Sequence, residues 1–222
     1  MSTSTPSAPH ARGTSVLSNR FKQGGRALLA PLIRLAMALH LTPNTITVIG
    51  LSITIIAATL VAFDILLVGA ALLAFGSLLD AVDGGLARAQ GSSTPFGAFF
   101  DSTLDRSGEA ILFIGLGIWL LRTQPDPVLP MLALLIAMAA SLLVSYAHAR
   151  AQGIGLSADV GLAPRTERLI LVITGVALAG LGFTAGLIGI LVILAILTVV
   201  TVAQRIWHVW HLSATTAHIK EN

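Results

Sequence analysis

Four aspartates lie close together in a sequence that is otherwise largely apolar: Asp80, Asp83, Asp101 and Asp105. If their segments are helical, Asp80 and Asp83 are three residues apart and share one helix face. Asp101 and Asp105 are four residues apart and share a face in the same way. Carboxylates held near one another repel in a medium of low dielectric, and hard divalent cations with oxygen ligands remove that repulsion. The spacing therefore predicts a metal site, and Mg²⁺ fits both the ligands and phosphate chemistry.

A structural alternative is that these acids only pair with Arg88 and Arg106 or cap helices. A charged group within a bilayer costs several kcal/mol on insertion scales, so such groups are usually functional. Four acids at helical spacing, beside the small residues Gly84, Ala87 and Gly97, are hard to explain as structure alone. We therefore interpret the quartet as a functional site.

The elements that must position these acids are membrane helices. Of the 222 residues, 55% are hydrophobic and only 10% are charged, and the mean hydropathy is +0.88. A soluble domain would have roughly 25% charged residues, so lipid is the expected outer solvent. A helix that crosses a bilayer needs about 20 apolar residues. The sequence thus predicts an all-α polytopic membrane protein with six transmembrane helices, over residues 45–63, 66–89, 96–121, 128–150, 168–183 and 186–210.

The segments around these spans divide the rest of the chain. Residues 1–16 are rich in Ser, Thr and Pro and lack an apolar run, so we expect a disordered cytoplasmic tail rather than a secretory signal. Residues 17–41 mix four basic residues with many leucines, which predicts an amphipathic helix in the membrane interface. The membrane domain is expected to cover residues 17–212, with its spans within 45–210, and residues 213–222 to form a C-terminal cytoplasmic tail.

The basic residues indicate the orientation. With the N-terminus inside, twelve of the 13 Lys and Arg residues fall on the cytoplasmic side, and only Arg122 falls outside. Both termini and the aspartates are therefore expected on the cytoplasmic side, and the Ala- and Leu-rich composition favours a bacterial plasma membrane. The 13 basic against 10 acidic residues form no basic patch with stacking aromatics, which argues against nucleic acid. The absence of cysteine excludes disulfides and thiolate zinc sites.

The spacing Asp-x2-Asp-Gly-x2-Ala-Arg-x8-Gly-x3-Asp-x3-Asp resembles the full signature of the CDP-alcohol phosphotransferase family. The predicted spans and the interfacial helix are also similar to that family, so the resemblance covers nearly the whole chain. It implies that Asp80, Asp83 and Asp101 are metal ligands. It also implies that Asp105 completes the metal site and is the general base on the acceptor hydroxyl. Two Mg²⁺ ions are expected, with Mn²⁺ as the alternative.

The resemblance also implies a site for CDP-diacylglycerol. Gly84 would let the nucleotide approach the backbone, Arg88 would contact the cytidine diphosphate, and Thr94 would donate to the nucleotide. A further part is the helix start at Asn44, Thr45, Ile46 and Thr47, whose free amides suit phosphate and whose counterpart touches the CDP-lipid in similar proteins. Asn44 is expected to cap this helix, and an ordinary cap with no ligand is the alternative.

Basic residues near the ends of the later spans bear on the acceptor: His148, Arg150, Arg165, Arg168 and Arg205. Arginines beside an anionic metal site indicate an acceptor that itself carries a phosphate, although anchoring to the cytoplasmic leaflet is the alternative. These segments are similar to those of phosphatidylinositol-phosphate synthases, which join inositol 1-phosphate to a CDP-linked lipid and release CMP. That likeness implies that Arg168 and Arg205 hold the inositol phosphate. His148 stands where such proteins usually have Lys or Arg.

Two other functions are open at this point. Phosphatidylglycerophosphate synthases use glycerol 3-phosphate, but the segment from Asp101 to Arg106 lacks the proline that is typical of them, which favours inositol phosphate. A divalent-cation transporter would be expected to carry acids at mid-span on several helices, and the spans other than 66–89 and 96–121 have none. Small residues in the third and fourth spans permit close helix packing in a dimer, and equally within one chain. A homodimer is expected. The partners would be CDP-diacylglycerol, a small phosphorylated alcohol and membrane lipids.

Overall fold

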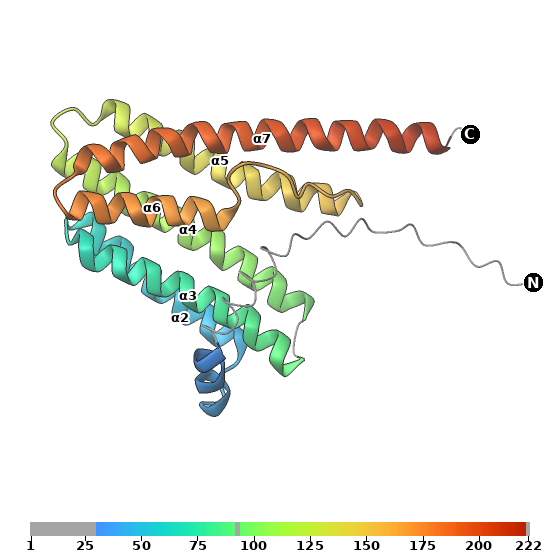
Figure 1. Cartoon of the computed structure of the whole chain (residues 1–222), viewed down its shortest axis with the longest axis horizontal. Coiled ribbons are helices and arrows are strands. Elements are labelled where there is room, and N and C mark those ends of the chain that lie inside the picture. The colour runs from blue at the N-terminus through green and yellow to red at the C-terminus, as the bar shows by residue number, and fades with distance from the viewer. Residues whose placement is uncertain (1–29, 92–93, 221–222) are drawn as a thin grey trace, which may run out of the picture.

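The structure is a computed structural model that describes residues 30–91 and 94–220. All regular structure within these residues is helical, as the sequence predicted (Figure 1). After a helical segment at residues 30–38, six helices follow: α2 Pro43–Ala62, α3 Leu66–Gln90, α4 Pro95–Thr123, α5 Val128–Gly153, α6 Arg165–Gly180 and α7 Thr184–Lys220. The helices α2 to α6 begin and end close to a predicted span, and the break at 181–183 separates α6 from α7. α7 begins close to the sixth predicted span but continues to Lys220, into the segment predicted as a C-terminal tail.

The predicted interfacial helix is described only in part. Residues 1–29, which contain the predicted tail and the first half of that helix, lie outside the described residues. In the remainder, Ala36 is buried with Val82 and Leu86 of α3, and Leu32 and Ile33 pack on the same small cluster. This segment therefore covers the end of α3 that carries the aspartates, and its place in a membrane interface stays a prediction.

Threonine followed by proline begins the two helices that frame the site. Thr42 caps α2, since its Oγ1 accepts a hydrogen bond from Thr45 N at 3.2 Å. Thr94 caps α4 in the same way. Proline suits the first helical position because its φ is already helical and its missing N–H is not needed there. The prediction that Asn44 caps α2 was wrong, because the helix begins at Pro43 and includes Asn44.

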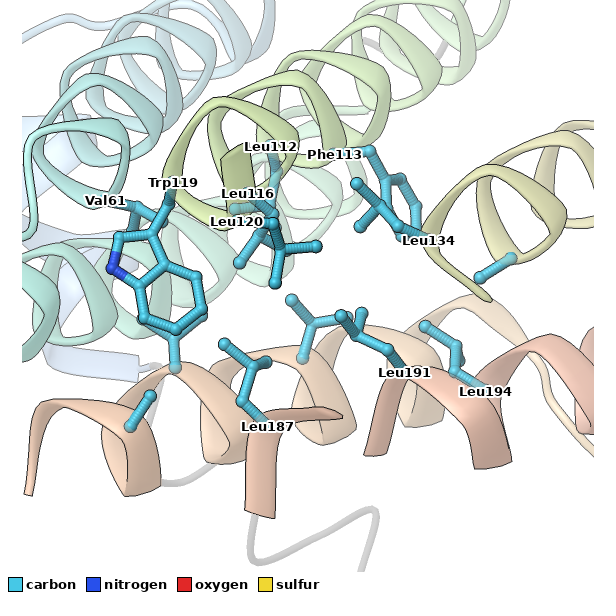
Figure 2. Packing of buried hydrophobic residues seen from close by; sticks show 14 of the residues in the cluster. Val61, Leu112, Phe113, Leu116, Trp119, Leu120, Leu134, Leu187, Leu191 and Leu194 are labelled. Atoms are coloured by element: carbon cyan, nitrogen blue, oxygen red, sulfur yellow. The ribbon is translucent and has the colours of Figure 1, made fainter. Parts of the chain in front are cut away.

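The helices pack as two neighbouring groups (Figure 1). α2 contacts both α3 and α4, while α7 contacts α5 and α6, and the groups meet where α3 packs on α6 and α4 on α5. The main core lies between them, where Leu116 and Leu120 of α4 face Leu187 and Leu191 of α7 (Figure 2). A Cβ on Gly115 would lie 2.5 Å from the carbonyl oxygen of Ala58, so α2 and α4 approach closely. α3 and α4 both pack on α2 rather than along each other, and they approach one another near the aspartates.

Within the residues that the structure describes, four helices are long and apolar enough to cross a membrane: Pro43–Ala62, Leu66–Ala87, Val128–Gly153 and Thr184–Ala214. α6 has 16 residues, about 24 Å of helix, which is short for a bilayer core. The first half of α4 carries several charged residues. The prediction of six spans is thus supported by helix length and composition for four of them.

A polar cluster fixes the opposite end of the bundle from the aspartates. The indole Nε1 of Trp119 donates to Asp64 Oδ1 at 2.7 Å, and Asp64 lies in the α2–α3 turn with φ of 67°. Arg122 Nη1 donates to the carbonyl of Ala62 at 3.2 Å. These contacts tie the C-terminal end of α4 to the α2–α3 turn. They therefore help to fix the position of α4 along its axis relative to α2 and α3, on which the approach of the acids depends.

Candidate metal and nucleotide site

The acids of α3 and α4 meet where the two helices join. Oxygens of Asp80, Asp101 and Asp105 all lie within 4.8 Å of one another, and all three residues are half-buried. These are oxygen donors only, at a separation that one or two hard divalent cations bridge, so the arrangement fits Mg²⁺ or Mn²⁺. The structure thus brings together three of the four acids that the sequence singled out.

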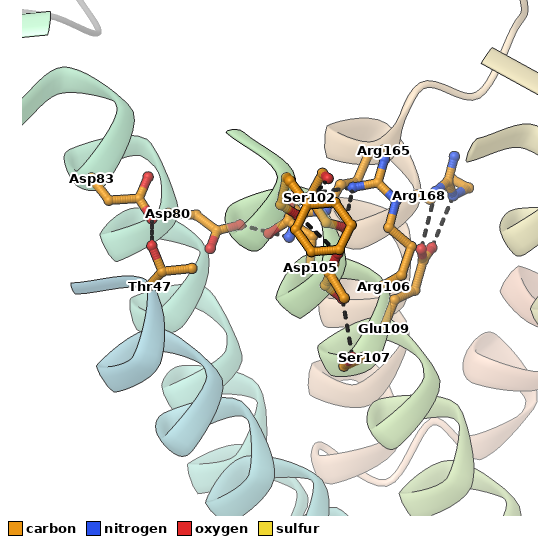
Figure 3. Close-up of polar contacts among 12 residues, drawn as sticks. Thr47, Asp80, Asp83, Ser102, Asp105, Arg106, Ser107, Glu109, Arg165 and Arg168 are labelled. Atoms are coloured by element: carbon orange, nitrogen blue, oxygen red, sulfur yellow. Dashed lines mark hydrogen bonds and ion pairs between the residues drawn. The ribbon is translucent and has the colours of Figure 1, made fainter. Parts of the chain in front are cut away.

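Asp83 turns toward α2 instead. It is 5% exposed, and the hydroxyl of Thr47 donates to its Oδ2 at 2.7 Å (Figure 3). Thr47 lies one turn into α2, so this hydrogen bond couples the acid-bearing face of α3 to the first turn of α2. Asp83 is outside the group of three in this arrangement.

A groove runs between the first turns of α2 and α4 and the later part of α3. Among the residues that line it are Asn44, Thr47, Gly84, Thr94 and Asp101. Four of these were predicted to bind the CDP-lipid, and they come from three helices, so the structure gathers them on one surface. A Cβ on Gly97 would lie 3.1 Å from Thr94 Oγ1, and this glycine keeps the groove open.

Two other residues predicted for the CDP-lipid, Thr45 and Ile46, lie elsewhere. The Thr45 hydroxyl is 2.8 Å from that of Thr42, on the exposed side of the helix start. Ile46 is 4% exposed and packs in the small cluster with Ala36. The side chain of Arg88 lies outside the described part of the chain.

One arginine of the second helix group reaches the acids. Arg165, the first residue of α6, places Nη2 2.6 Å from Asp80 Oδ2 and Nη1 2.8 Å from Asp105 Oδ2 (Figure 3). Arg106 is a weaker neighbour, with Nη1 3.5 Å from Asp105 Oδ2. Burial by itself lowers the pKa of the Arg165 guanidinium, but the charges of Asp105 and Asp80 outweigh it and raise that pKa. Arg165 is therefore a permanent cation held between the two acid-bearing helices.

Arg168, one turn further along α6, is used differently. It is 1% exposed, and its Nε and Nη2 donate to the two oxygens of Glu109 at 3.0 and 3.1 Å. Its Nη1 donates to the carbonyl of Ala163 at 3.0 Å. Glu109 was not among the predicted residues, although it continues the acidic face of Asp101 and Asp105 at the same spacing of four. This spacing was the signal that could have found it.

The remaining predicted acceptor residues contact other groups. His148 Nδ1 is 3.4 Å from Asp159 Oδ1. Arg205 donates from Nε to the carbonyl of Val160 at 3.0 Å and from Nη1 to that of Val144 at 2.6 Å. Arg150 is exposed. In the contacts described for residues 30–91 and 94–220, none of these three basic residues reaches Asp80, Asp83, Asp101 or Asp105.

A cavity on the other side of the acids lies between α2, α3, α4 and α6. Asp80, Asp105, Glu109, Arg165 and Arg168 form its polar wall. The rest of its lining is apolar or small, with the residues Gly50, Leu51, Leu73, Gly76, Leu104, Gly108, Leu112, Phe113, Leu169 and Val172 beside Thr47, Thr54 and Ser77. The acids thus stand at a boundary, with the groove on the side of Asp101 and this cavity on the side of Asp80 and Asp105.

Helices of membrane length and a compact group of acids at one end define an integral membrane protein with a candidate metal centre. The sequence profile of the CDP-alcohol phosphatidyltransferase family matches residues 40–215. The chain belongs to this family and is a transferase of substituted phosphate groups. The predicted family and the predicted class of enzyme are therefore confirmed.

Curated relatives include the phosphatidylinositol phosphate synthase of Corynebacterium glutamicum, which is 33% identical over 162 residues, 72% of this chain and 74% of the relative. The synthase of the same name from Mycolicibacterium smegmatis is 38% identical over 157 residues, 70% of each chain. Among solved structures, the Mycobacterium tuberculosis phosphatidylinositol phosphate synthase with CDP-DAG bound has a TM-score of 0.77 and 34% identity, covering 83% of this chain and 94% of that one. The same synthase in complex with manganese and citrate has a TM-score of 0.76 and 34% identity, covering 82% and 88%.

Proposed function

We propose that this enzyme transfers the phosphatidyl group of CDP-diacylglycerol to inositol 1-phosphate, giving phosphatidylinositol phosphate and CMP. The observation that carries the proposal is the position of the acids between two hollows. The groove offers the residues predicted for the CDP-lipid, and the cavity offers arginines suited to a phosphorylated acceptor. The relatives named phosphatidylinositol phosphate synthase support this choice of acceptor.

In the proposed mechanism the acids hold the metal and one of them moves the proton. Asp80, Asp83, Asp101 and Asp105 would be the ligands of two divalent ions, with Mg²⁺ expected and Mn²⁺ supported by a related structure that contains manganese. When bound, the metal supplies neutralisation of charge on the diphosphate oxygens. Asp105, which faces the cavity, would accept the proton of the acceptor hydroxyl as its oxygen bonds to the lipid-linked phosphorus. The bond from that phosphorus to CMP breaks, and CMP leaves with the electron pair.

Binding of the CDP-lipid is assigned to the groove. In the first turn of α2 the amide of Asn44 would meet a phosphate, because the start of a helix presents unpaired N–H groups. The amides of Thr45 and Ile46 already donate to Thr42. Gly84 and Thr94 would face the nucleotide from α3 and α4, and Arg88 would contact the diphosphate. Thr47 supports the lining by its hydrogen bond to Asp83.

Binding of the acceptor is assigned to the cavity, with its phosphate gripped by Arg165. Arg168 lines the same cavity, but its hydrogen bonds to Glu109 and Ala163 indicate that it positions α6 as well. Direct roles for His148, Arg150 and Arg205 stay predictions. The test is CMP release from CDP-diacylglycerol with inositol 1-phosphate, glycerol 3-phosphate, serine and free inositol in parallel. Release with inositol 1-phosphate above the others is expected, and release with glycerol 3-phosphate alone would refute the assignment.

We also propose that all six helices span a bacterial plasma membrane, as one domain over residues 17–212, with the site and both termini cytoplasmic. The excess of basic residues on one side supports this orientation. Because the chain has no cysteine, single cysteines can report it. A membrane-impermeant maleimide should label Asp126→Cys in intact cells but not Ser157→Cys, and the reverse result would invert the topology. A homodimer is expected, and mass measurement in native nanodiscs would test it.

A further inference from the structure

Arg165 and a metal ion would use the same two acids. The guanidinium of Arg165 is paired with Asp80 on α3 and with Asp105 on α4, at 2.6 and 2.8 Å. Both acids belong to the group of three whose oxygens lie within 4.8 Å of one another. A divalent cation held by that group would lie within a few ångströms of a permanent positive charge, and like charges at such range repel. The two cations therefore compete for Asp80 and Asp105.

The backbone near Arg165 is anchored, whereas the Arg165 guanidinium is held only by the two acids. Arg168 anchors the first turn of α6 through Glu109 and the carbonyl of Ala163. The Arg165 side chain is 34% exposed, against 2% for Arg168. It also lines the cavity assigned to the acceptor. A rotation of this one side chain would exchange the carboxylates for a group in the cavity.

A phosphate monoester is a suitable group for that exchange. The forked guanidinium binds carboxylate and phosphate oxygens in the same bidentate geometry. Arg106 is not suited to this role, because its Nη1 donates to the carbonyl of Ser102 on its own helix at 2.9 Å and is 3.5 Å from Asp105.

We propose that Arg165 couples metal binding to acceptor binding. It neutralises Asp80 and Asp105 when no metal is held, and the phosphate of the acceptor draws it away so that the acids are released to the metal. This inference rests on the proposed function for the nature of the acceptor. Because coupling between two ligands is reciprocal, the phosphorylated acceptor then raises metal affinity by the same factor by which metal raises acceptor affinity.

The test measures Mn²⁺ binding to the purified protein in nanodiscs without CDP-lipid. Binding is monitored through the electron paramagnetic resonance signal of free Mn²⁺. Arg165→Met should bind Mn²⁺ about tenfold more tightly than the unaltered protein, within the usual range of coupling between sites. Arg165→Lys should fall between them, because one ammonium cannot bridge both acids. Inositol 1-phosphate should tighten Mn²⁺ binding to the unaltered protein about tenfold, free inositol should not, and Arg165→Met should gain nothing from either.

Arg34→Met is the matched control. Arg34 is exposed, and no contact with an acid is described for it, so this variant loses the same charge without freeing a carboxylate. It should keep both the Mn²⁺ affinity and the effect of inositol 1-phosphate. Thermal unfolding, monitored by tryptophan fluorescence, verifies that each variant is folded. If Arg165→Met does not fold, Arg165→Lys still decides the test.

Two results would overturn the inference. Unchanged or weaker Mn²⁺ binding in Arg165→Met would mean that Arg165 orders the acids rather than competing for them. An effect of inositol 1-phosphate that persists in this variant would mean that another group grips the phosphate. Failure of the proposed function is separate, since it appears as absent CMP release with inositol 1-phosphate whatever the Mn²⁺ affinity. Running glycerol 3-phosphate beside inositol 1-phosphate distinguishes a wrong acceptor from an absent coupling.

Discussion

The buried pair of Glu109 and Arg168 should be one of the most sensitive points of the bundle. Its side chains are 14% and 2% exposed, and the arginine makes two hydrogen bonds to the carboxylate and one to Ala163. Removing one partner of a buried pair leaves an uncompensated charge and costs about 3–5 kcal/mol. Glu109→Gln keeps the shape and one acceptor oxygen, so we expect the lower end, about 3 kcal/mol. At about 2–4 °C for each kcal/mol, the midpoint of thermal unfolding should fall by about 6–12 °C.

Tryptophan fluorescence is a suitable assay for this loss. Trp119 is 2% exposed in α4, the helix that carries Glu109, so its emission reports on loss of the core around it. The matched control removes both charges, in Glu109→Leu with Arg168→Met. Because replacing a whole buried pair by apolar groups is often neutral, the double variant should be more stable than Glu109→Gln. The reasoning would be refuted if Glu109→Gln lowered the free energy of unfolding by less than about 0.5 kcal/mol. It would also be refuted if the double variant lost as much stability as Glu109→Leu and Arg168→Met lose together as single variants.

Three further predictions concern the site and the packing beneath it. Asp105→Asn should abolish CMP release yet bind CDP-diacylglycerol nearly as tightly, measured by fluorescent CDP-lipid titration, and normal turnover would exclude Asp105 as the base. Chelation of divalent ions should abolish turnover, and added Mg²⁺ should restore it, whereas residual activity in chelator would contradict a metal centre. Gly115→Ala should lower the unfolding midpoint, because its Cβ would lie 2.5 Å from the Ala58 carbonyl oxygen, while Gly189→Ala, with no atom within 4 Å, should not.

The helices were predictable because their signals are local. Apolar runs of membrane length and the Thr-Pro pairs at 42–43 and 94–95 define where α2 and α4 begin. The cap of α2 shows the limit of such reasoning. Thr42 and Asn44 are both good capping residues, and the proline between them, which prefers the first helical position, was the signal that decided for Thr42.

The acids of the site were predictable from spacing, but their partners were not. Asp80 lies near Asp101 and Asp105 because α3 and α4 follow each other in the chain and both pack on α2. The contact of Arg165 with Asp80 joins residues 85 positions apart, and that of Arg168 with Glu109 joins residues 59 apart. Both depend on how α6 packs against α3 and α4, which no local pattern encodes. For the same reason we predicted Arg168 only as a ligand-binding residue. In the structure its Nε, Nη1 and Nη2 donate to Glu109 and to the carbonyl of Ala163.

The position of the acids between groove and cavity suits the proposal that each hollow takes one substrate. The groove lies at the starts of α2 and α4, and the cavity carries the arginines. In an in-line displacement the acceptor hydroxyl would attack the lipid-linked phosphorus opposite the leaving CMP, with the hydroxyl on the cavity side and CMP on the groove side.

The most direct test of the central claim is to identify the lipid formed by the purified protein in liposomes that contain CDP-diacylglycerol. With inositol 1-phosphate and Mg²⁺, mass spectrometry should find phosphatidylinositol phosphate and CMP in equal amounts, and neither in the Asp105→Asn variant. CMP without phosphatidylinositol phosphate, or no CMP with any phosphorylated acceptor, would contradict the account.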